Sequence, residues 1–163
     1  MTRKRLTIVL SAAVLTAIGY VGVESLRGGA RADDLQTVVD TRRATMKDIA
    51  AQTKAIYAVV DAKSGDMADM QKRALQIQAD AAKIPTLFPP GTSTSQLGDK
   101  THALPAIWEQ MDSFKADAAN LETQAGKLAA AAQGGDMAAF SAQFAAMGKA
   151  CGTCHTDFRA KLN

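Results

Sequence analysis

Apolar residues recur at intervals of three and four positions along most of this 163-residue chain, and three turn-rich segments interrupt the pattern. Such spacing puts the apolar side chains on one face of a helix, so each uninterrupted stretch predicts an amphipathic helix. We expect helices over residues 34–62, 67–83 and 100–132, and a last helix that begins after Asp136. Four helices joined by turns predict an all-α fold, an antiparallel four-helix bundle.

The segments between the helices supply start and stop signals. Asp66 and Asp136 each precede a helical stretch and can cap it, because a short carboxylate accepts hydrogen bonds from the first free N–H groups of a helix. Three prolines and Gly91, between positions 85 and 91, end the second helix, and the Thr/Ser-rich segment that follows, up to Asp99, predicts an exposed loop. Pro105 is compatible with the third helix only in its first turn, and Trp108 is expected to pack inside the protein.

The apolar seams of the first and last helices also carry polar and sulfur-bearing side chains. The first seam contains Leu35, Val38, Val39, Arg42, Met46, Ile49, Thr53, Ile56 and Val60. The last contains Phe140, Phe144, Met147, Cys151, Cys154 and Phe158. Both cysteines therefore face the predicted interior.

Composition is consistent with a helical core. Apolar residues make up 47% of the chain and aromatic residues 5%, so small and aliphatic side chains must fill the interior, which favours packed helices over a β-sandwich. The length suits one domain rather than two. With 12 glycines and 4 prolines, a collagen-like or disordered chain is excluded.

The first 32 residues have the organisation of a secretory signal peptide. Basic residues at positions 3–5 precede an uncharged run over 6–23, and Ala30 and Ala32 provide the small residues of a cleavage site after Ala32. The alternative is an uncleaved membrane anchor, because the 18 uncharged residues approach the length of a bilayer span. We expect a signal peptide at 1–32, a bundle domain at 33–163 and export to the periplasm.

Removal of the leader would reverse the sign of the net charge. The full chain carries +3, whereas residues 33–163 contain 14 basic and 15 acidic residues and carry −1. The excess of basic residues thus belongs to the targeting segment. Nucleic acid is therefore not expected as a partner.

Cys151-Gly152-Thr153-Cys154-His155 is the most specific motif of the chain, and it matches the attachment signature of haem c. Two thiols three positions apart on one helix face can bind the two vinyl groups of one porphyrin, and His155 can coordinate the iron. Three alternatives stay open: a redox-active dithiol, a zinc site completed by His102, and a structural disulfide. The dithiol lacks a strand–helix context, zinc has only His102 as a fourth ligand, and a disulfide gives His155 no role.

The helical pattern with this motif near the C-terminus, continued by residues 156–159, resembles the class II cytochromes c, which include cytochrome c prime and cytochrome c-556. Further segments that resemble the family are 42–47 in the first helix, 87–91 in the loop and 104–108 at the start of the third helix. The resemblance implies a bundle with one covalently attached haem c. Its first helix crosses the distal face of the haem, with Met46 at the distal position.

The resemblance also implies roles for individual residues. Met46 would be the second axial ligand of the iron, and the alternative for it is simple packing in the core. Arg42, one turn before Met46, would pair with a haem propionate or remain a solvated charge at the rim. Arg159 would tune the basicity of His155, or simply place a cation at a helix C-terminus. His102 is expected on the surface.

These expectations together predict a periplasmic mono-haem electron carrier rather than an enzyme. Redox proteins would be its partners, a membrane would be one only if the leader is retained, and a homodimer is implied through an apolar strip on the first two helices. The alternative function is a five-coordinate haem protein that binds nitric oxide or carbon monoxide. The charges of Asp112, Lys115, Asp117 and Glu122 are expected on a solvated face.

Overall fold

The computed structural model describes residues 32–161, so the predicted signal peptide lies outside the described residues except for Ala32. Four long helices follow the apolar spacing: α1 (Ala32–Ala62), α2 (Met67–Lys83), α5 (Met111–Gly134) and α6 (Met137–Phe158). The connection between α2 and α5 holds two 3-10 helices, Ile84–Leu87 and Gly98–Lys100, and the short helices α3 (Thr94–Leu97) and α4 (Ala106–Glu109).

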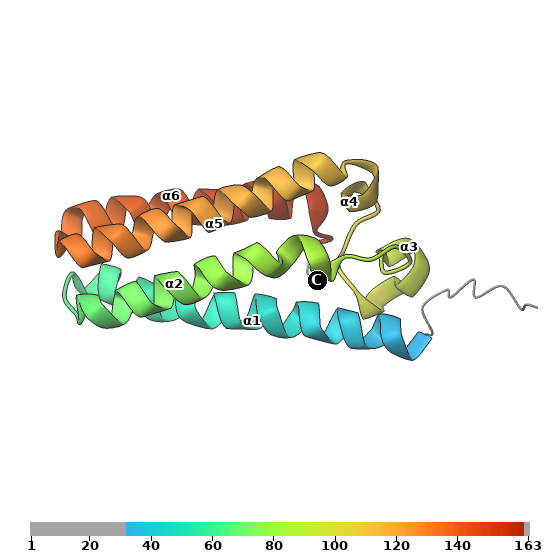
Figure 1. Cartoon of the computed structure of the whole chain (residues 1–163), viewed down its shortest axis with the longest axis horizontal. Coiled ribbons are helices and arrows are strands. Elements are labelled where there is room, and N and C mark those ends of the chain that lie inside the picture. Colours follow the sequence, from blue (N-terminus) through green and yellow to red (C-terminus); the bar gives the residue numbers. More distant parts are fainter. Residues whose placement is uncertain (1–31, 162–163) are drawn as a thin grey trace, which may run out of the picture.

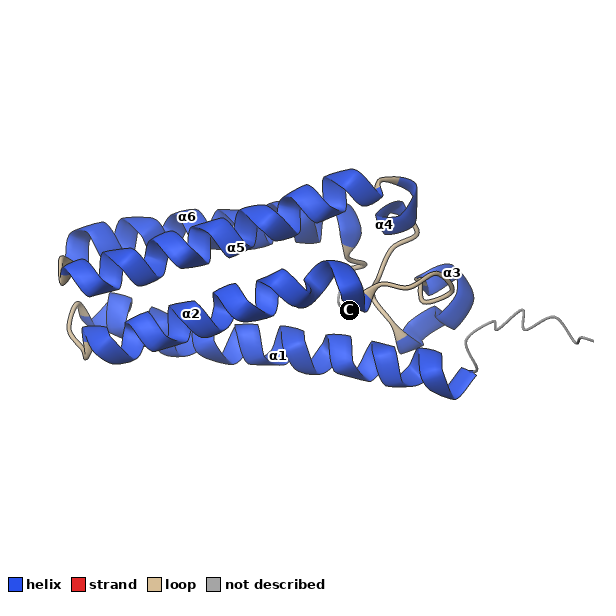
Figure 2. Ribbon diagram, in the orientation of Figure 1, coloured by secondary structure: helices blue, strands red, loops and turns tan. Residues whose placement is uncertain are grey.

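The long helices form the antiparallel four-helix bundle that the sequence predicts. Each runs opposite to its neighbour in the chain, with the two tight turns at one end and the α2–α5 connection at the other (Figures 1 and 2). The pairs α1–α2, α2–α5 and α5–α6 pack along their lengths, whereas α1 and α6 touch more sparingly. The core is aliphatic and alanine-rich with a few aromatic rings, and its most deeply buried large side chains are Phe140, Ile56, Ile77, Ile107, Leu128, Met147 and Val39.

Both predicted helix caps are confirmed. The Asp66 carboxylate accepts a hydrogen bond from the N–H of Ala68 at 2.9 Å, and Asp136 accepts one from Ala138 at 2.8 Å. The turn after α5 depends on Gly135, whose φ of +74° lies in the left-handed region that favours glycine. Local sequence signals thus set three of the four helix ends at the end of the bundle that holds the two tight turns. These are the start of α2, the end of α5 and the start of α6.

The third helix begins later than predicted. Residues 101–104 are extended rather than helical, because their backbone pairs with the chain that follows α6. The Leu104 N–H donates to the carbonyl of Phe158 at 3.0 Å, and the Ala160 N–H donates to the carbonyl of His102 at 2.8 Å. We call this pairing the C-terminal tie. Pro105 directly precedes α4, where its missing N–H costs no hydrogen bond.

The prediction of an exposed loop in the Thr/Ser-rich segment up to Asp99 is wrong at the start of that segment. Thr92 and Ser93 are buried, with 0% and 3% of their surface exposed. Phe88 is also buried, and Trp108 donates its indole N–H to the Phe88 carbonyl at 3.1 Å. The segment turns inward because its polar groups serve as hydrogen-bond partners for a buried side chain of α1, described below.

Two observations concern the surface of the bundle. Within residues 32–161, no helix is long and apolar enough to cross a bilayer. The large hydrophobic side chains that stay exposed in this part of the chain are Tyr57 on α1 and Leu75 on α2. The apolar strip predicted on the first two helices is therefore limited to these two side chains.

Candidate functional site

A cavity of about 630 Å³ opens at the end of the bundle that holds the α2–α5 connection. Its walls come from α1, α5, α6 and the segment between α2 and α5, and its volume is typical of a site for an organic cofactor. Phe114 packs edge-on against Phe88 and Phe158, with ring centroids 4.7 and 5.4 Å apart. These three rings form one apolar end of the cavity.

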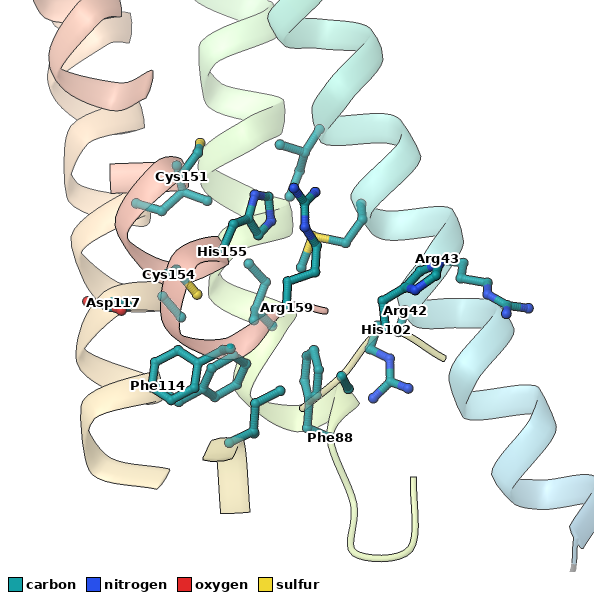
Figure 3. Close-up of a pocket in the computed structure, with 18 of the residues that line it drawn as sticks. Arg42, Arg43, Phe88, His102, Phe114, Asp117, Cys151, Cys154, His155 and Arg159 are labelled. Atoms are coloured by element: carbon teal, nitrogen blue, oxygen red, sulfur yellow. The ribbon is translucent and has the colours of Figure 1, made fainter. Parts of the chain in front are cut away.

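The α6 wall carries the whole motif of the last helix. Cys151, Cys154 and His155 all line the cavity, and the three are half-buried. Figure 3 shows His155 pointing into the space between α6 and α1, with Cys154 close to Phe114. The helix brings the two thiols to one face because they are separated by three positions.

The environment of the two thiols differs from that of a redox-active dithiol. Burial raises the pKa of Cys154 to about 12, with a further contribution from the carboxylate of Asp117. Burial also raises the pKa of Cys151. A reactive dithiol needs a lowered thiol pKa, because the thiolate is the nucleophile. The environment of this pair therefore argues against dithiol chemistry.

Neither a zinc site nor a structural disulfide is supported by the geometry. Among residues 32–161, no three His, Cys, Asp or Glu side chains come together as a group that could hold a metal ion. This finding argues against the zinc site that His102 would complete. Cys151 and Cys154 do not form a disulfide with each other.

The imidazole of His155 is suited to bind a metal in its neutral form. Burial lowers its pKa below the ordinary value, and the nearby guanidinium of Arg159 lowers it further. A neutral imidazole keeps a lone pair available for coordination. Arg159 stands at the C-terminal end of α6, is exposed and lines the cavity, which is compatible both with tuning of the imidazole and with a cation at a helix C-terminus.

Met46 lines the same cavity from α1. Its side chain is half-buried and packs against the hydrophobic core. Met46 and His155 therefore face one cavity from two helices that are adjacent in space and far apart in the sequence. A flat group between these helices would have one of the two side chains on each face.

Arg42 is buried, so the expectation of a solvated charge at this position is wrong. Only 5% of its surface is exposed. Its guanidinium donates to the hydroxyl of Thr101 at 2.8 Å and to the carbonyl of Thr92 at 3.3 Å, and it lies 4.4 Å from the centre of the Phe88 ring. Burial lowers the pKa of Arg42 to about 10, and the neighbouring Arg43 cation contributes.

The buried guanidinium of Arg42 has polar partners but forms no ion pair with a carboxylate that the structure describes. A buried cation is costly without a nearby negative charge. Because Arg42 lines the cavity, an anionic group bound there would supply that charge. The cavity thus combines apolar walls with a cation prepared for an anion.

The surroundings of His102 and Asp117 differ from those expected. His102 is exposed as predicted, but it lines the cavity from an extended segment rather than from the start of a helix. Asp117 is half-buried in the α5 wall and not on a solvated face. Burial raises the pKa of Asp117, and the carboxylate of Asp157 raises it further. Its spacing from Phe114 and Leu121 already places it beside the apolar seam.

These residues fit a covalently bound haem. Such a haem is a flat apolar ring with two vinyl-derived thioether bonds, two propionates and an iron open to axial ligands on both faces. The cavity offers apolar walls, two thiols on one wall, an imidazole and a thioether from facing helices, and a buried guanidinium. Fold and cavity together define a helical-bundle haem protein.

Comparison with known proteins identifies the family. The profile of the family described as Cytochrome C′ matches residues 37–159. Cytochrome c′ of Pararhodospirillum photometricum and cytochrome c-556 of Agrobacterium tumefaciens (strain II Chrys) are each 35% identical over 124 residues, which is 76% of this chain and 97% of each relative. The chain belongs to the cytochrome c′ family, whose cofactor is a covalently attached c-type haem with its iron.

Solved structures agree. Cytochrome c′ from Thermochromatium tepidum has a TM-score of 0.72 at 29% identity, over 78% of this chain and 97% of that one. A mutant of cytochrome c prime from Alcaligenes xylosoxidans, in complex with nitric oxide, has a TM-score of 0.69 at 26% identity over the same shares. A third structure, with a TM-score of 0.69 at 28% identity over the same shares, is a cytochrome c′ with ligand-controlled dimer dissociation.

Proposed function

We propose that this protein is a periplasmic mono-haem c-type cytochrome that carries single electrons between partner proteins, with its iron held between His155 and Met46. The observation that carries the proposal is the position of these two side chains, which line one cavity from two different helices. When bound, the haem supplies the one-electron redox couple of its iron.

We assign the attachment of the haem to Cys151 and Cys154. Their thiols share one face of α6 and lie in the cavity wall. His155 is the next residue along α6 after Cys154, one turn beyond Cys151. Covalent attachment would hold the cofactor edge against α6.

His155 and Met46 would fix the iron on both faces. The thioether of Met46 is a soft ligand that favours ferrous iron and raises the reduction potential relative to a second histidine. Both side chains come from long, packed helices, which would limit the movement of the two ligands when the charge of the iron changes. Small rearrangement on reduction favours rapid electron transfer.

Arg42 would orient the anionic edge of the cofactor. Its guanidinium is already fixed by Thr92, Thr101 and the Phe88 ring, so a propionate would meet a preorganised donor. The aromatic end of the cavity begins at the Phe88 ring under this guanidinium, and its apolar rings would limit the access of water to the bound cofactor. Substrate turnover is not part of the proposal, because Asp117 is the only carboxylate that lines the described cavity.

The periplasmic location rests on the leader segment, which we propose is removed after Ala32. The mature chain would then consist of the bundle domain at 33–163. Mass spectrometry of the protein purified from the periplasmic fraction tests this assignment. A mass that retains residues 1–32, with the protein in the membrane fraction, would favour the anchor instead.

A second function, binding of nitric oxide or carbon monoxide at five-coordinate iron, is favoured by one observation. The cytochrome c prime of Alcaligenes xylosoxidans, to which this chain is similar, is known as a nitric oxide complex. In that function Met46 would only pack against the core and leave the distal face open. The two functions therefore differ in whether the sulfur of Met46 binds iron.

Absorption and electron paramagnetic resonance spectra of the purified protein separate the two functions. Ligation by Met46 predicts a low-spin ferric signal and slow uptake of carbon monoxide by the ferrous form. The substitution Met46→Ala should then give a high-spin haem that takes up carbon monoxide readily. Met111→Ala is the matched control, because Met111 is also half-buried against the core but does not line the cavity. A wild-type protein that is already high-spin contradicts the ligation.

A further inference from the structure

The charged residues among the exposed residues of the cavity wall are all basic. Most lining side chains are buried or half-buried, and those that remain exposed mark the mouth of the cavity. The exposed lining residues are Arg43, Lys47, Ala50, His102 and Arg159. Four of these five carry basic nitrogen, and none carries a carboxylate. We call Arg43, Lys47, His102 and Arg159 the basic rim.

The rim is assembled from three separate parts of the chain. Arg43 and Lys47 stand one turn apart on α1, His102 belongs to the extended segment before α4, and Arg159 follows α6. The C-terminal tie holds the last two together through the antiparallel bridge between Ala103 and Arg159. Figure 3 shows Arg43 and His102 on the α1 side of the cavity and Arg159 between them and His155.

Little of this charge is neutralised inside the molecule. Arg43 forms an ion pair with Asp40 at 3.3 Å and also donates to the carbonyl of Lys100. Lys47 and Arg159 form no ion pair with any side chain that the structure describes. Asp117 is the only acid among the residues that line the described cavity, and it is half-buried on α5 rather than exposed at the mouth.

The sign of the rim is opposite to that of the whole domain. Residues 33–163 carry a net charge of −1, and the two propionates of a bound haem make the domain more negative. A local patch and a net charge of opposite sign predict opposite effects of salt on the approach of a charged partner. Because a partner that exchanges electrons must come close to the cofactor, the local patch decides the encounter.

We propose that the basic rim is the docking surface for the acidic face of a redox partner protein. The proposal rests on the proposed function, because it takes the cavity mouth as the place where electrons leave and enter. Carboxylates around the partner's own redox centre would pair with Lys47 and Arg159. Pairs of this kind increase the association rate and set orientation more than they increase affinity.

Small redox reagents of opposite charge test the sign of the field at the mouth. Ferricyanide carries three negative charges, accepts one electron from the reduced protein and becomes ferrocyanide. Tris(phenanthroline)cobalt(III) carries three positive charges and accepts one electron to become cobalt(II). As ionic strength rises from about 10 mM to about 200 mM, we expect the ferricyanide rate to fall several-fold and the cobalt rate to rise. If the net charge of the domain controlled the encounter instead, the ferricyanide rate would rise with ionic strength and the cobalt rate would fall.

A charge-reversal pair locates the effect. Lys47→Glu should lower the ferricyanide rate at low salt by about tenfold and remove its decrease with salt. Lys127→Glu makes the same change in net charge on the exposed surface of α5, outside the cavity wall, and should leave the rate within about twofold of wild type. Equal effects of the two substitutions, or a ferricyanide rate that rises with salt in the wild type, would overturn the proposal.

A binding measurement gives a readout that does not depend on electron transfer. Isothermal titration calorimetry of the oxidised protein with polyglutamate at low salt should show binding by the wild type and by Lys127→Glu. Binding by Lys47→Glu should be weakened about tenfold. Absence of wild-type binding contradicts the docking surface. Absorption spectra of each variant distinguish failure of the docking surface from failure of the Met46 ligation. A high-spin iron would refute ligation by Met46, but the effect of the rim charges on binding could still be measured.

Discussion

Replacement of Arg42 by leucine removes a buried cation that connects α1 to the α2–α5 segment. The side chain is 5% exposed and donates to Thr101 at 2.8 Å and to Thr92 at 3.3 and 3.4 Å. It also covers the Phe88 ring at 4.4 Å. Leucine keeps part of the apolar contact but makes none of the hydrogen bonds.

The expected loss of stability follows from these contacts. A good hydrogen bond from a charged donor contributes about 1.5–3 kcal/mol, and the longer contacts to Thr92 contribute less. A desolvated cation over an aromatic ring contributes about 2 kcal/mol. The lowered pKa of Arg42 shows that burial of its charge is costly, and leucine does not have this cost. The gain offsets part of the loss. Thr101 keeps a partner, because its hydroxyl also accepts from Ala103 at 3.2 Å. We expect the free energy of unfolding to fall by about 2 kcal/mol.

Urea denaturation of the haem-loaded protein, followed by circular dichroism, measures this loss. Arg43→Leu is the matched control, because Arg43 is exposed and its substitution should cost less than about 0.5 kcal/mol. Loss of a cation beside the cofactor should also lower the reduction potential of the Arg42 variant, because a positive charge disfavours the more positive ferric state. Equal stability of the two variants would show that Arg42 does not hold the segment in place.

Three further outcomes test other parts of the site. A haem stain should persist through denaturing electrophoresis in the wild type and disappear in the double variant Cys151→Ala, Cys154→Ala; a wild type without stain refutes covalent attachment. Asp136→Ala removes the cap of α6 and should lower the free energy of unfolding by about 1 kcal/mol in the same urea assay, and an unchanged midpoint would contradict the capping role. Because burial raises the pKa of Asp117, with a further contribution from Asp157, its negative charge appears at a higher pH than that of an ordinary aspartate. The new negative charge favours ferric iron, so the reduction potential should decrease with rising pH in the wild type, and Asp117→Asn should flatten that decrease in spectroelectrochemical titrations.

The parts of the fold that follow local rules could be predicted from the sequence. Periodic apolar residues define α2 and α6, and short polar side chains such as Asp66 and Asp136 define where these helices begin. The cofactor motif could be found because its chemistry requires three residues at fixed spacing within one helix. Each of these signals lies within a few positions along the chain.

The parts that depend on distant partners could not be predicted. Thr92 is a small polar residue in a proline-rich segment, and its hydroxyl donates locally to the carbonyl of Pro89. Its burial also depends on the guanidinium of Arg42, fifty positions away, which donates to its hydroxyl and carbonyl oxygens. Pro105 disfavours a helical conformation at Leu104, but no local signal predicts that residues 101–104 are extended. Their extended conformation depends on pairing with the chain after α6, which no local pattern records.

The C-terminal tie has a consequence for local opening of the site. The last turn of a helix normally frays, and its amides exchange with solvent at a low free-energy cost. Here the carbonyl of Phe158 and the N–H of Ala160 are both held by the backbone of residues 102–104, one turn beyond His155. The end of α6 can therefore open only together with the segment that precedes α4. The amides of Leu104 and Ala160 should exchange as slowly as those of the bundle core, and exposure of the histidine should need cooperative unfolding rather than fraying.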